Sequence, residues 1–277
     1  MKYSITSYSL SQLLRSGLTT QFSMIALAKT LGFDGIEFTD LIVPEGMTEE
    51  AYALALKAEA ARCGMDIVSH TVGANLLADD QPAEIARLKH KVDIAALLGA
   101  PTMRHDAYFG FPANDPEPSF EKYLDKVADG FREVAAYAQT KGVKLCTENH
   151  GFICQAPERV EAIIKKVNHP NFGWLVDMGN FLCADADPIH AVTVAAPYAF
   201  HVHAKDFVKL PSPEGCIKTP GGNFIQGTIV GQGIVPVKEC VNILRKAGYD
   251  GYMTVEFEGP QPALSAVAQG LAFLKSC

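Results

Sequence analysis

A short unit recurs five times along the chain and strongly limits what the chain can fold into. In each copy an amphipathic helical stretch ends at a glycine, and a short apolar run follows. Glycine takes the left-handed backbone conformation that closes many helices, so each copy marks a junction from a helix to a strand. The glycines are Gly32, Gly64, Gly99, Gly142 and Gly248. Five helices are therefore expected to lead into five strands.

Three further apolar runs have the same character without the glycine, which gives eight expected strands. The eight runs start near residues 2, 33, 65, 99, 143, 172, 198 and 251. Their mean spacing is roughly 36 residues, the length of one strand and one helix of a barrel. No linker rich in proline or glycine divides the chain, and no G-x-G-x-x-G motif follows the first run, as a doubly wound dinucleotide-binding sheet would require. We therefore predict an α/β protein whose residues 1–277 form a single (β/α)8 TIM barrel.

Composition and charge narrow the class of function. The 277 residues are 48% hydrophobic and 20% charged, which excludes a disordered chain. The net charge is -7 and no cluster of lysine and arginine offsets it, so a nucleic-acid partner is not expected. We see no secretory leader and no apolar run of about 18 residues, and so predict a cytoplasmic protein without a membrane partner.

Polar residues gather where the expected strands end, and the ends of four consecutive strands stand out. These strands end in Glu148, Asp177, His203 and Glu256. Singly, each would be read as a capping or solvated residue, but neighbouring strands lie about 4.8 Å apart, so four inward side chains would converge. Three carboxylates so close together repel one another unless a cation lies among them. The set predicts one divalent ion, Mn²⁺ or Mg²⁺ by its oxygen-rich ligands, with Co²⁺ and Zn²⁺ as alternatives.

Four motifs carry a family resemblance. They read TENHG around Glu148, LVDMGN around Asp177, HVHAKD around His203 and GYDGYMTVE ending at Glu256. Together they resemble the metal-binding motifs of the sugar phosphate isomerase/epimerase family of xylose isomerase-like TIM barrels. That family has tagatose and psicose 3-epimerases, hydroxypyruvate isomerases, inosose dehydratases and endonuclease IV as relatives.

The resemblance implies both an activity and a ligand set. It implies a sugar or sugar phosphate isomerase or epimerase that works through an enediolate on a small carbohydrate substrate. One divalent ion, often Mn²⁺, would be bound by the four motif residues, and Glu148 and Glu256 would also act as the acid/base pair. His203 is preferred to His201 as the ligand, because the liganding histidine of that family stands three residues before an acidic residue, here Asp206. Homodimers or homotetramers are also implied.

Five further strand-end residues are expected to contact substrate. Arg104 is read either as a ligand of substrate oxygen or as a buried ion-pair partner of Glu37, and Lys205 either contacts substrate or braces Glu148 or Asp177. Asn180 stands where many epimerases of the family have histidine, and it can form hydrogen bonds but cannot take a proton at neutral pH. The five residues are His70, Arg104, Asn180, His201 and Lys205.

Two other functions share this scaffold. A dehydratase of the inosose or dehydroshikimate type would use the same metal and the same first proton transfer. An endonuclease IV-like nuclease is the remote alternative, since it would use three metals, more histidines and a basic face for DNA, whereas this chain carries a net charge of -7.

A long segment separates the seventh strand from the next helix. Residues 207–233 span about 27 residues, against the 2–6 usual for such a connection, and contain many prolines and glycines. We expect a mobile cover over the metal site, with Phe207, Phe224 and Ile225 on its apolar underside. A plain surface excursion or an oligomer contact is the alternative.

Overall fold

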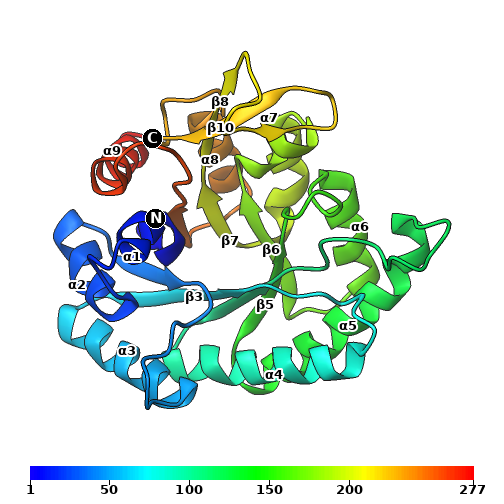
Figure 1. Cartoon of the computed structure of the whole chain (residues 1–277), viewed down its shortest axis with the longest axis horizontal. Coiled ribbons are helices and arrows are strands. Elements are labelled where there is room, and N and C mark those ends of the chain that lie inside the picture. The colour runs from blue at the N-terminus through cyan, green and yellow to red at the C-terminus, as the bar shows by residue number, and fades with distance from the viewer.

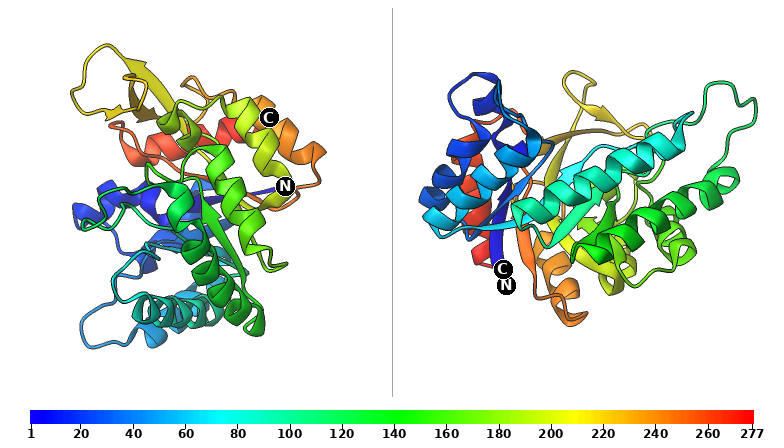
Figure 2. Two further views of the ribbon diagram at one scale, coloured as in Figure 1. Left: turned by 90° about the vertical axis from the view of Figure 1, so that its right-hand side faces the viewer. Right: turned by 90° about the horizontal axis from the view of Figure 1, so that it is seen from below.

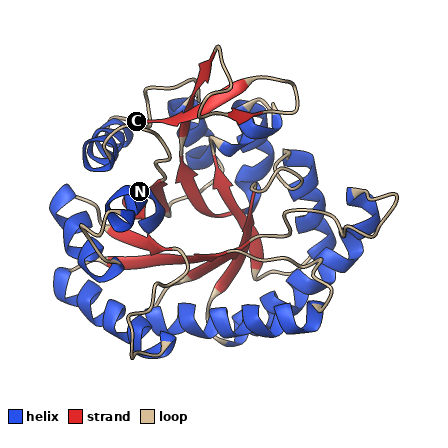
Figure 3. Ribbon diagram, in the orientation of Figure 1, coloured by secondary structure: helices blue, strands red, loops and turns tan.

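The computed structural model describes all 277 residues and confirms the predicted barrel. Eight parallel strands close into a barrel in the order β1-β11-β7-β6-β5-β4-β3-β2. Helices form an outer layer around it (Figures 1 and 3). The barrel strands are β1 (Lys2–Thr6), β2 (Gly35–Phe38), β3 (Asp66–Val72), β4 (Thr102–His105), β5 (Lys144–Glu148), β6 (Phe172–Asp177), β7 (Ala199–Ala204) and β11 (Tyr252–Val255).

The helices that alternate with these strands end as the glycine pattern predicts. Helices α2, α3 and α4 are capped by Gly32, Gly64 and Gly99, whose φ angles of 89°, 61° and 76° lie in the left-handed region. The helices are α1 (Ser11–Arg15), α2 (Gln21–Leu31), α3 (Glu49–Cys63), α4 (Gln81–Leu98), α5 (Phe120–Thr140), α6 (Pro157–Val167), α7 (Pro188–Ala195), α8 (Val237–Lys246) and α9 (Ala263–Lys275). Three 3-10 turns, η1 (Ser7–Leu10), η2 (Asn180–Ala184) and η3 (Ala196–Tyr198), complete the chain.

One continuous core of 68 buried residues joins the barrel to its helices. Between α5 and the barrel, the Phe131 ring stacks on His105 with 4.6 Å between ring centroids and packs against Phe172 at 4.7 Å. Burying each of these two phenylalanine side chains contributes about 1.5–3 kcal/mol to the stability of the fold. The two ends of the chain meet between β1 and α9, where the Tyr3 hydroxyl donates to the Leu274 carbonyl. No helix is both long enough and apolar enough to cross a membrane.

The long segment after β7 is a small antiparallel sheet. Its strands are β8 (Asp206–Leu210), β9 (Ile217–Lys218) and β10 (Phe224–Thr228), in the order β8-β10-β9. The sheet stands out from the barrel, in yellow in both views of Figure 2. We call residues 206–228 the β-extension.

Two local contacts fix the β-extension to the barrel. The Asp206 carboxylate accepts hydrogen bonds from the backbone N–H groups of Gly231, Gly233 and Val235 at 2.8–3.0 Å, and so folds the chain back toward α8. At Gly227 there is no room for a Cβ, because it would collide with the Glu258 carbonyl. The backbone of β10 therefore lies directly against the segment that follows β11.

Candidate metal centre

Four side chains from neighbouring strands converge at the C-terminal end of the barrel. Glu148 ends β5, Asp177 ends β6, His203 lies on β7 and Glu256 directly follows β11. Each offers one ligand atom, and these four atoms lie within 4.8 Å of one another. From His203 Nδ1, the distances are 3.5 Å to Glu256 Oε2, 3.7 Å to Glu148 Oε1 and 4.0 Å to Asp177 Oδ2. The structure thus brings the four predicted residues together.

Two of these ligand atoms are buried and have no hydrogen-bond partner, namely Asp177 Oδ2 and His203 Nδ1. Asp177 directs that oxygen into the site because its other oxygen accepts from the backbone N–H groups of Gly179, at 2.7 Å, and Asn180, at 2.8 Å. Unpaired buried polar atoms cost about 1–3 kcal/mol each. A cation between them would remove that cost.

The electrostatics of the group also favour a cation. Burial raises the pKa of the Asp177 carboxyl well above its usual range, and the Glu256 and Glu148 carboxylates add to the rise. Burial would lower the pKa of His203, but the charges of Glu37 and Glu256 outweigh it and hold that pKa well above its usual range. Positive charge is therefore stabilised at this point of the site.

The spacing and chemistry of the set fit a divalent ion. Octahedral binding at about 2.1 Å places ligand atoms about 3–4.2 Å apart, and the distances from His203 Nδ1 fall within that range. Carboxylate oxygens with one imidazole suit Mn²⁺ and Mg²⁺, and no cysteine sulfur enters the group.

Glu37 lies fully buried on the far side of the His203 ring. Its two carboxylate oxygens accept from His203 Nε2 at 3.0 and 3.1 Å, which leaves Nδ1 to face the other three ligands. His201 Nε2 lies 3.1 Å from Glu37 Oε2 and 2.9 Å from the Thr254 hydroxyl. Burial would raise the pKa of Glu37, but the His203 charge and the histidine hydrogen bonds outweigh it and hold that pKa well below its usual range. Glu37 is thus a carboxylate that orients His203.

Arg104 does not form the ion pair with Glu37 that was one of its two predicted roles. Its guanidinium instead lies 2.8 Å from Glu148 Oε2 and 2.6 Å from Asp106 Oδ1. The other oxygen of Glu148 accepts from the Asn180 amide at 3.0 Å. The contacts with Arg104 and Asn180 fix the plane of the Glu148 carboxylate. Glu37 instead has His201 and His203 as its neighbours.

One prediction paired Lys205 with Glu148 or Asp177, but Lys205 forms an ion pair with neither. Its ammonium group lies 3.2 Å from Glu256 Oε2 and 2.7 Å from Glu258 Oε2. Burial would lower the pKa of Lys205, but the Glu256 and Asp177 carboxylates outweigh it and hold the pKa well above its usual range. Lys205 therefore carries a positive charge beside the Glu256 carboxylate, since the strand end places it on the β11 side of the barrel.

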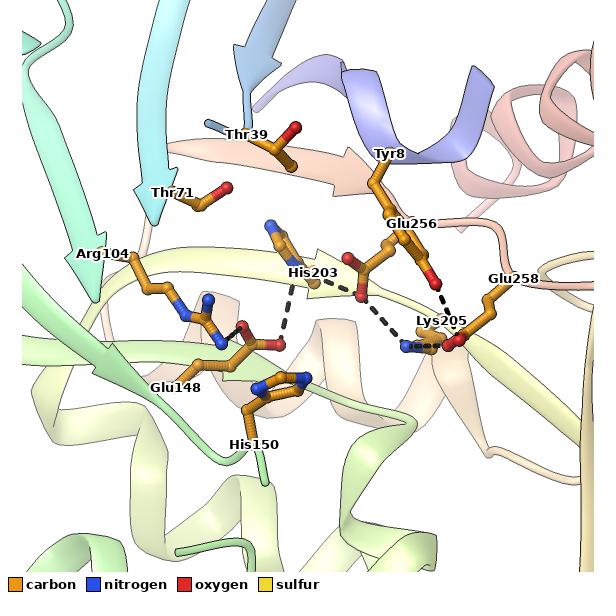
Figure 4. Close-up of a pocket in the computed structure, with 10 residues that line it drawn as sticks. All are labelled: Tyr8, Thr39, Thr71, Arg104, Glu148, His150, His203, Lys205, Glu256 and Glu258. Carbon is orange, nitrogen blue, oxygen red and sulfur yellow. Dashed lines mark hydrogen bonds and ion pairs between the residues drawn. The ribbon is translucent and has the colours of Figure 1, made fainter. Parts of the chain in front are cut away.

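A cavity of about 200 Å³ opens above this group. Figure 4 shows Glu148 and Glu256 on either side of His203, with Arg104 and Lys205 at the two flanks. Nearly all of its lining is polar: Tyr8, Thr39, Thr71, Arg104, Glu148, His150, His203, Lys205, Glu256 and Glu258. Such a lining suits a small molecule rich in hydroxyl groups.

Three residues expected at the substrate do not line this cavity. His70 is fully buried with its Nδ1 on the Phe38 carbonyl, and its neighbour Thr71 lines the cavity instead, because successive residues of a strand face opposite sides. His201 lies beneath the cavity against Glu37, and Asn180 lies behind Glu148. We therefore correct the interpretation of His70, whereas the substrate contacts expected of His201 and Asn180 stay predictions.

The sequence argument missed His150 as a cavity residue. Its Nδ1 lies 2.8 Å from Asp106 Oδ1, and its ring lines the cavity. The available signal was its place two residues after Glu148, on the same face. Tyr8, Thr39 and Thr71 were also missed, although Tyr8 and Thr39 come just after a strand and Thr71 is the last residue but one of β3. The register of β2 against β3 shifts at Ile36 and Glu37, which no sequence pattern reveals.

No residue of segment 207–233 lines this cavity. Phe207 and Ile225 are buried, but they pack with Cys183 at the base of the β-extension. In this structure the segment therefore does not line the cavity above the carboxylates, and its movement to cover the metal site stays a prediction. Asp206 holds the returning chain toward α8.

Comparison with known proteins supports the same scaffold. The family model described as "Xylose isomerase-like TIM barrel" matches residues 25–277. An inosose dehydratase from Glaesserella parasuis is 31% identical over 150 residues, which are 50% of this chain and 49% of that protein. The chain thus matches about half the length of this relative.

Two solved structures show the same fold at low identity. D-psicose 3-epimerase, solved in the presence of D-fructose, aligns with a TM-score of 0.74 at 19% identity and covers 100% of this chain and 99% of its own. A xylose isomerase-like TIM barrel protein from Mycobacterium smegmatis, in complex with magnesium, aligns with a TM-score of 0.70 at 20% identity, covering 92% of this chain and 86% of its own. With its closed eight-stranded barrel and the match over residues 25–277, this chain belongs to the xylose isomerase-like TIM barrel family.

Proposed function

We propose that the protein is a metal-dependent isomerase or epimerase of a sugar or sugar phosphate. Its single divalent ion would be held by Glu148, Asp177, His203 and Glu256. The observation that carries this proposal is the pair of buried, unpartnered atoms, Asp177 Oδ2 and His203 Nδ1, placed between two glutamates. Mn²⁺ is the ion we propose, with Mg²⁺, Co²⁺ and Zn²⁺ as alternatives of similar ligand preference.

A bound ion of this kind supplies a Lewis acid that polarises a substrate carbonyl and makes the adjacent C–H more acidic. The two glutamates flank the place where that carbon would lie. One carboxylate removes the proton, which yields an enediolate of the substrate, and the other returns a proton from the opposite side. Arg104 and Lys205 each hold one of the two carboxylates by an ion pair, at 2.8 and 3.2 Å. They keep the pair in place during the transfer.

The cavity lining supports a carbohydrate. The hydroxyls of Thr39 and Thr71 line the 200 Å³ space across from Glu148 and Glu256, and the Tyr8 hydroxyl lies at its edge, where it donates to Glu258 at 2.8 Å. Hydroxyl groups both donate and accept hydrogen bonds, so they can match the hydroxyls of a sugar in either sense. Fixed partners of this type orient the carbonyl and its neighbouring hydroxyl toward the base.

The proposal predicts hydrogen exchange before any product is known. The Mn²⁺-loaded protein, given free ketoses, phosphorylated ketoses and inososes in D₂O, is expected to incorporate deuterium next to the carbonyl of its substrate. Proton NMR measures this as loss of one C–H signal. The same samples with chelator in excess provide the control. If no sugar of the panel incorporates deuterium, the proposal is overturned.

A dehydratase is the second function that a specific observation favours. His150 lines the cavity with its Nδ1 held by Asp106 at 2.8 Å, an arrangement suited to protonating a leaving hydroxyl. The similarity over half the chain to a protein named inosose dehydratase points the same way. Loss of water would give a conjugated enone, so growing ultraviolet absorbance in the exchange experiment would favour this alternative.

Glu37 provides a test of the metal site that does not depend on turnover. Glu37→Gln keeps the shape of the side chain but loses the charge that favours the Nε2–H form of His203, whose Nδ1 is then free to bind a cation. We expect the affinity for Mn²⁺ to fall about 10- to 100-fold, as for other partners of ligating histidines. Isothermal titration calorimetry with Mn²⁺ measures it.

Glu59→Gln is the matched control for this substitution. Glu59 is also a buried glutamate, but it lies on α3 and pairs with Arg62 at 2.6 Å, away from the barrel opening. Its Mn²⁺ affinity should equal that of the unaltered protein. Equal affinities for Glu37→Gln and Glu59→Gln would refute the orienting role of Glu37.

A further inference from the structure

A second cavity adjoins the first at the side of β5 and β6. Its volume is about 160 Å³, and it shares His150, Lys205 and Glu258 with the cavity above the carboxylates. The remaining lining residues are Phe109, Gly151, Phe152, Gln155, Asn180, Cys183 and Ile217. Ile217 comes from the β-extension, which therefore forms one wall of this second cavity. Neither cavity alone reaches the about 300 Å³ of ordinary ligand sites, whereas the two joined do.

Two phenylalanine rings stand exposed at this cavity. Phe109 is 52% exposed and Phe152 is 69% exposed, although burial of either ring would be favourable. Phe152 also has a φ of 36°, in the left-handed region that a bulky side chain rarely adopts. Backbone strain of this kind costs about 1–3 kcal/mol and persists where a site requires it. The Phe109 ring meets His150 edge to face at 5.7 Å, so the aromatic surface continues into the first cavity.

Gln155, one of the residues that line the second cavity, carries a buried acceptor without a partner. Gln155 is only 5% exposed, and its Oε1 has no hydrogen-bond partner. Leaving such an atom unpaired costs about 1–3 kcal/mol, which a donor from a ligand would offset. A hydroxyl group is such a donor, whereas the oxygens of an ionised phosphate only accept. The neighbouring Glu258 carboxylate likewise disfavours a phosphate here.

We propose that the second cavity binds a glycosyl ring, so that the substrate is a ketose carrying a sugar substituent. This inference rests on the proposed function and names its substrate class. The reacting ketose would lie in the first cavity, between Glu148 and Glu256. The C–H face of the attached ring would pack on Phe109 and Phe152, and one of its hydroxyls would donate to Gln155 Oε1.

The test compares one ketose with its glucosylated forms. Binding of D-fructose, turanose, maltulose, leucrose and isomaltulose to the Mn²⁺-loaded full chain is measured by isothermal titration calorimetry. These disaccharides attach glucose at different oxygens of fructose, so they sample the directions in which the second ring can leave the first cavity. At least one is expected to bind 10-fold or more tightly than D-fructose, with its glucosyl protons marked in saturation-transfer NMR.

Two substitutions locate the gain in affinity. Gln155→Met removes the acceptor and is expected to weaken the tighter disaccharide about 2- to 10-fold, the value of one hydrogen bond, without changing the affinity for D-fructose. Phe152→Asn removes the ring, and asparagine tolerates the left-handed backbone, so the loop should keep its shape. Gln269→Met on α9 and Phe22→Asn on α2 are the matched controls, since both residues are exposed and neither lines one of the two cavities.

The outcomes separate this inference from the proposed function. If no disaccharide binds more tightly than D-fructose, or if the tighter binding survives both substitutions, the glycosyl site is overturned. If the tighter binding depends on Gln155 and Phe152 but no ketose in the panel exchanges hydrogen in D₂O, the glycosyl site is supported and the isomerase proposal fails. If D-fructose exchanges hydrogen and the second ring adds no affinity, the isomerase proposal is supported and the glycosyl site is overturned.

Discussion

Glu148→Gln and Glu256→Gln are each expected to lower turnover by about 10²- to 10⁴-fold, the usual contribution of a general acid or base. The amide has the shape of the carboxylate but cannot accept or return the proton. Both residues sit in fixed partnerships, Glu148 with Arg104 and Glu256 with Lys205, so the substituted amides should occupy the same places. The readout is the steady-state rate on the substrate found by the exchange screen.

Because both glutamates are also proposed ligands, rate alone does not separate acid/base chemistry from loss of metal. Deuterium incorporation next to the carbonyl is therefore measured at saturating Mn²⁺. It should vanish in the variant that lacks the base and persist in the variant that lacks only the returning acid. Glu133→Gln on α5, exposed and paired with Lys89, is the control with unchanged rate. Persistent exchange in both active-site variants would point to another base, with His150 the next residue to test.

Asp177→Ala is expected to abolish stoichiometric binding of the divalent ion. The loss of affinity should exceed the about 10- to 100-fold that removal of an outer partner costs, because Asp177 would be a direct ligand. Metal per chain, measured by elemental analysis after dialysis against Mn²⁺, should fall from about one to near zero. Unchanged metal content would refute the assignment of Asp177 as a metal ligand.

Thermal unfolding gives the same test a second readout. Without metal, Asp177 adds a buried carboxylate beside two others, and burial raises its pKa well above the usual range. A raised carboxyl pKa means that the ionised form destabilises the fold at neutral pH. Asparagine removes this charge but keeps an oxygen for the backbone N–H groups of Gly179 and Asn180, so the metal-free Asp177→Asn variant should unfold no earlier than the metal-free parent. Added Mn²⁺ should raise the midpoint of the parent alone, since only a ligand that binds the folded state stabilises it.

The barrel could be predicted because its signals are local. A glycine at the end of each of α2, α3 and α4 follows from the φ angle that the helix end requires, and no distant contact is needed to recognise it. Apolar runs between these helices mark parallel strands buried on both faces. The β-extension was harder, because its short strands pair with one another across turns that contain Pro213 and Gly222, and its composition suggests turns alone.

The convergence of Glu148, Asp177, His203 and Glu256 was also within reach of the sequence. Parallel strands all end at one rim, so residues at four successive strand ends must lie near one another. The sequence did not, however, allow us to predict which partner each charged residue contacts. Arg104 pairs with Glu148 as well as with its near neighbour Asp106, Lys205 pairs with Glu256 and Glu258, and Glu37 with two histidines. Except for Arg104 and Asp106, these partners lie more than 40 residues apart in the sequence.

The sequence by itself determined the fold class, the rim that holds the candidate site and the convergence of its four residues, since these follow from strand period and chain direction. Only the tertiary structure decided which side chains enter the cavity. Thr71 faces it and His70 does not, because facing depends on strand tilt and on the register shift between β2 and β3. The joining of two cavities at His150, Lys205 and Glu258 likewise depends on how three separate loops pack, and packing between distant segments leaves no periodic trace in a sequence.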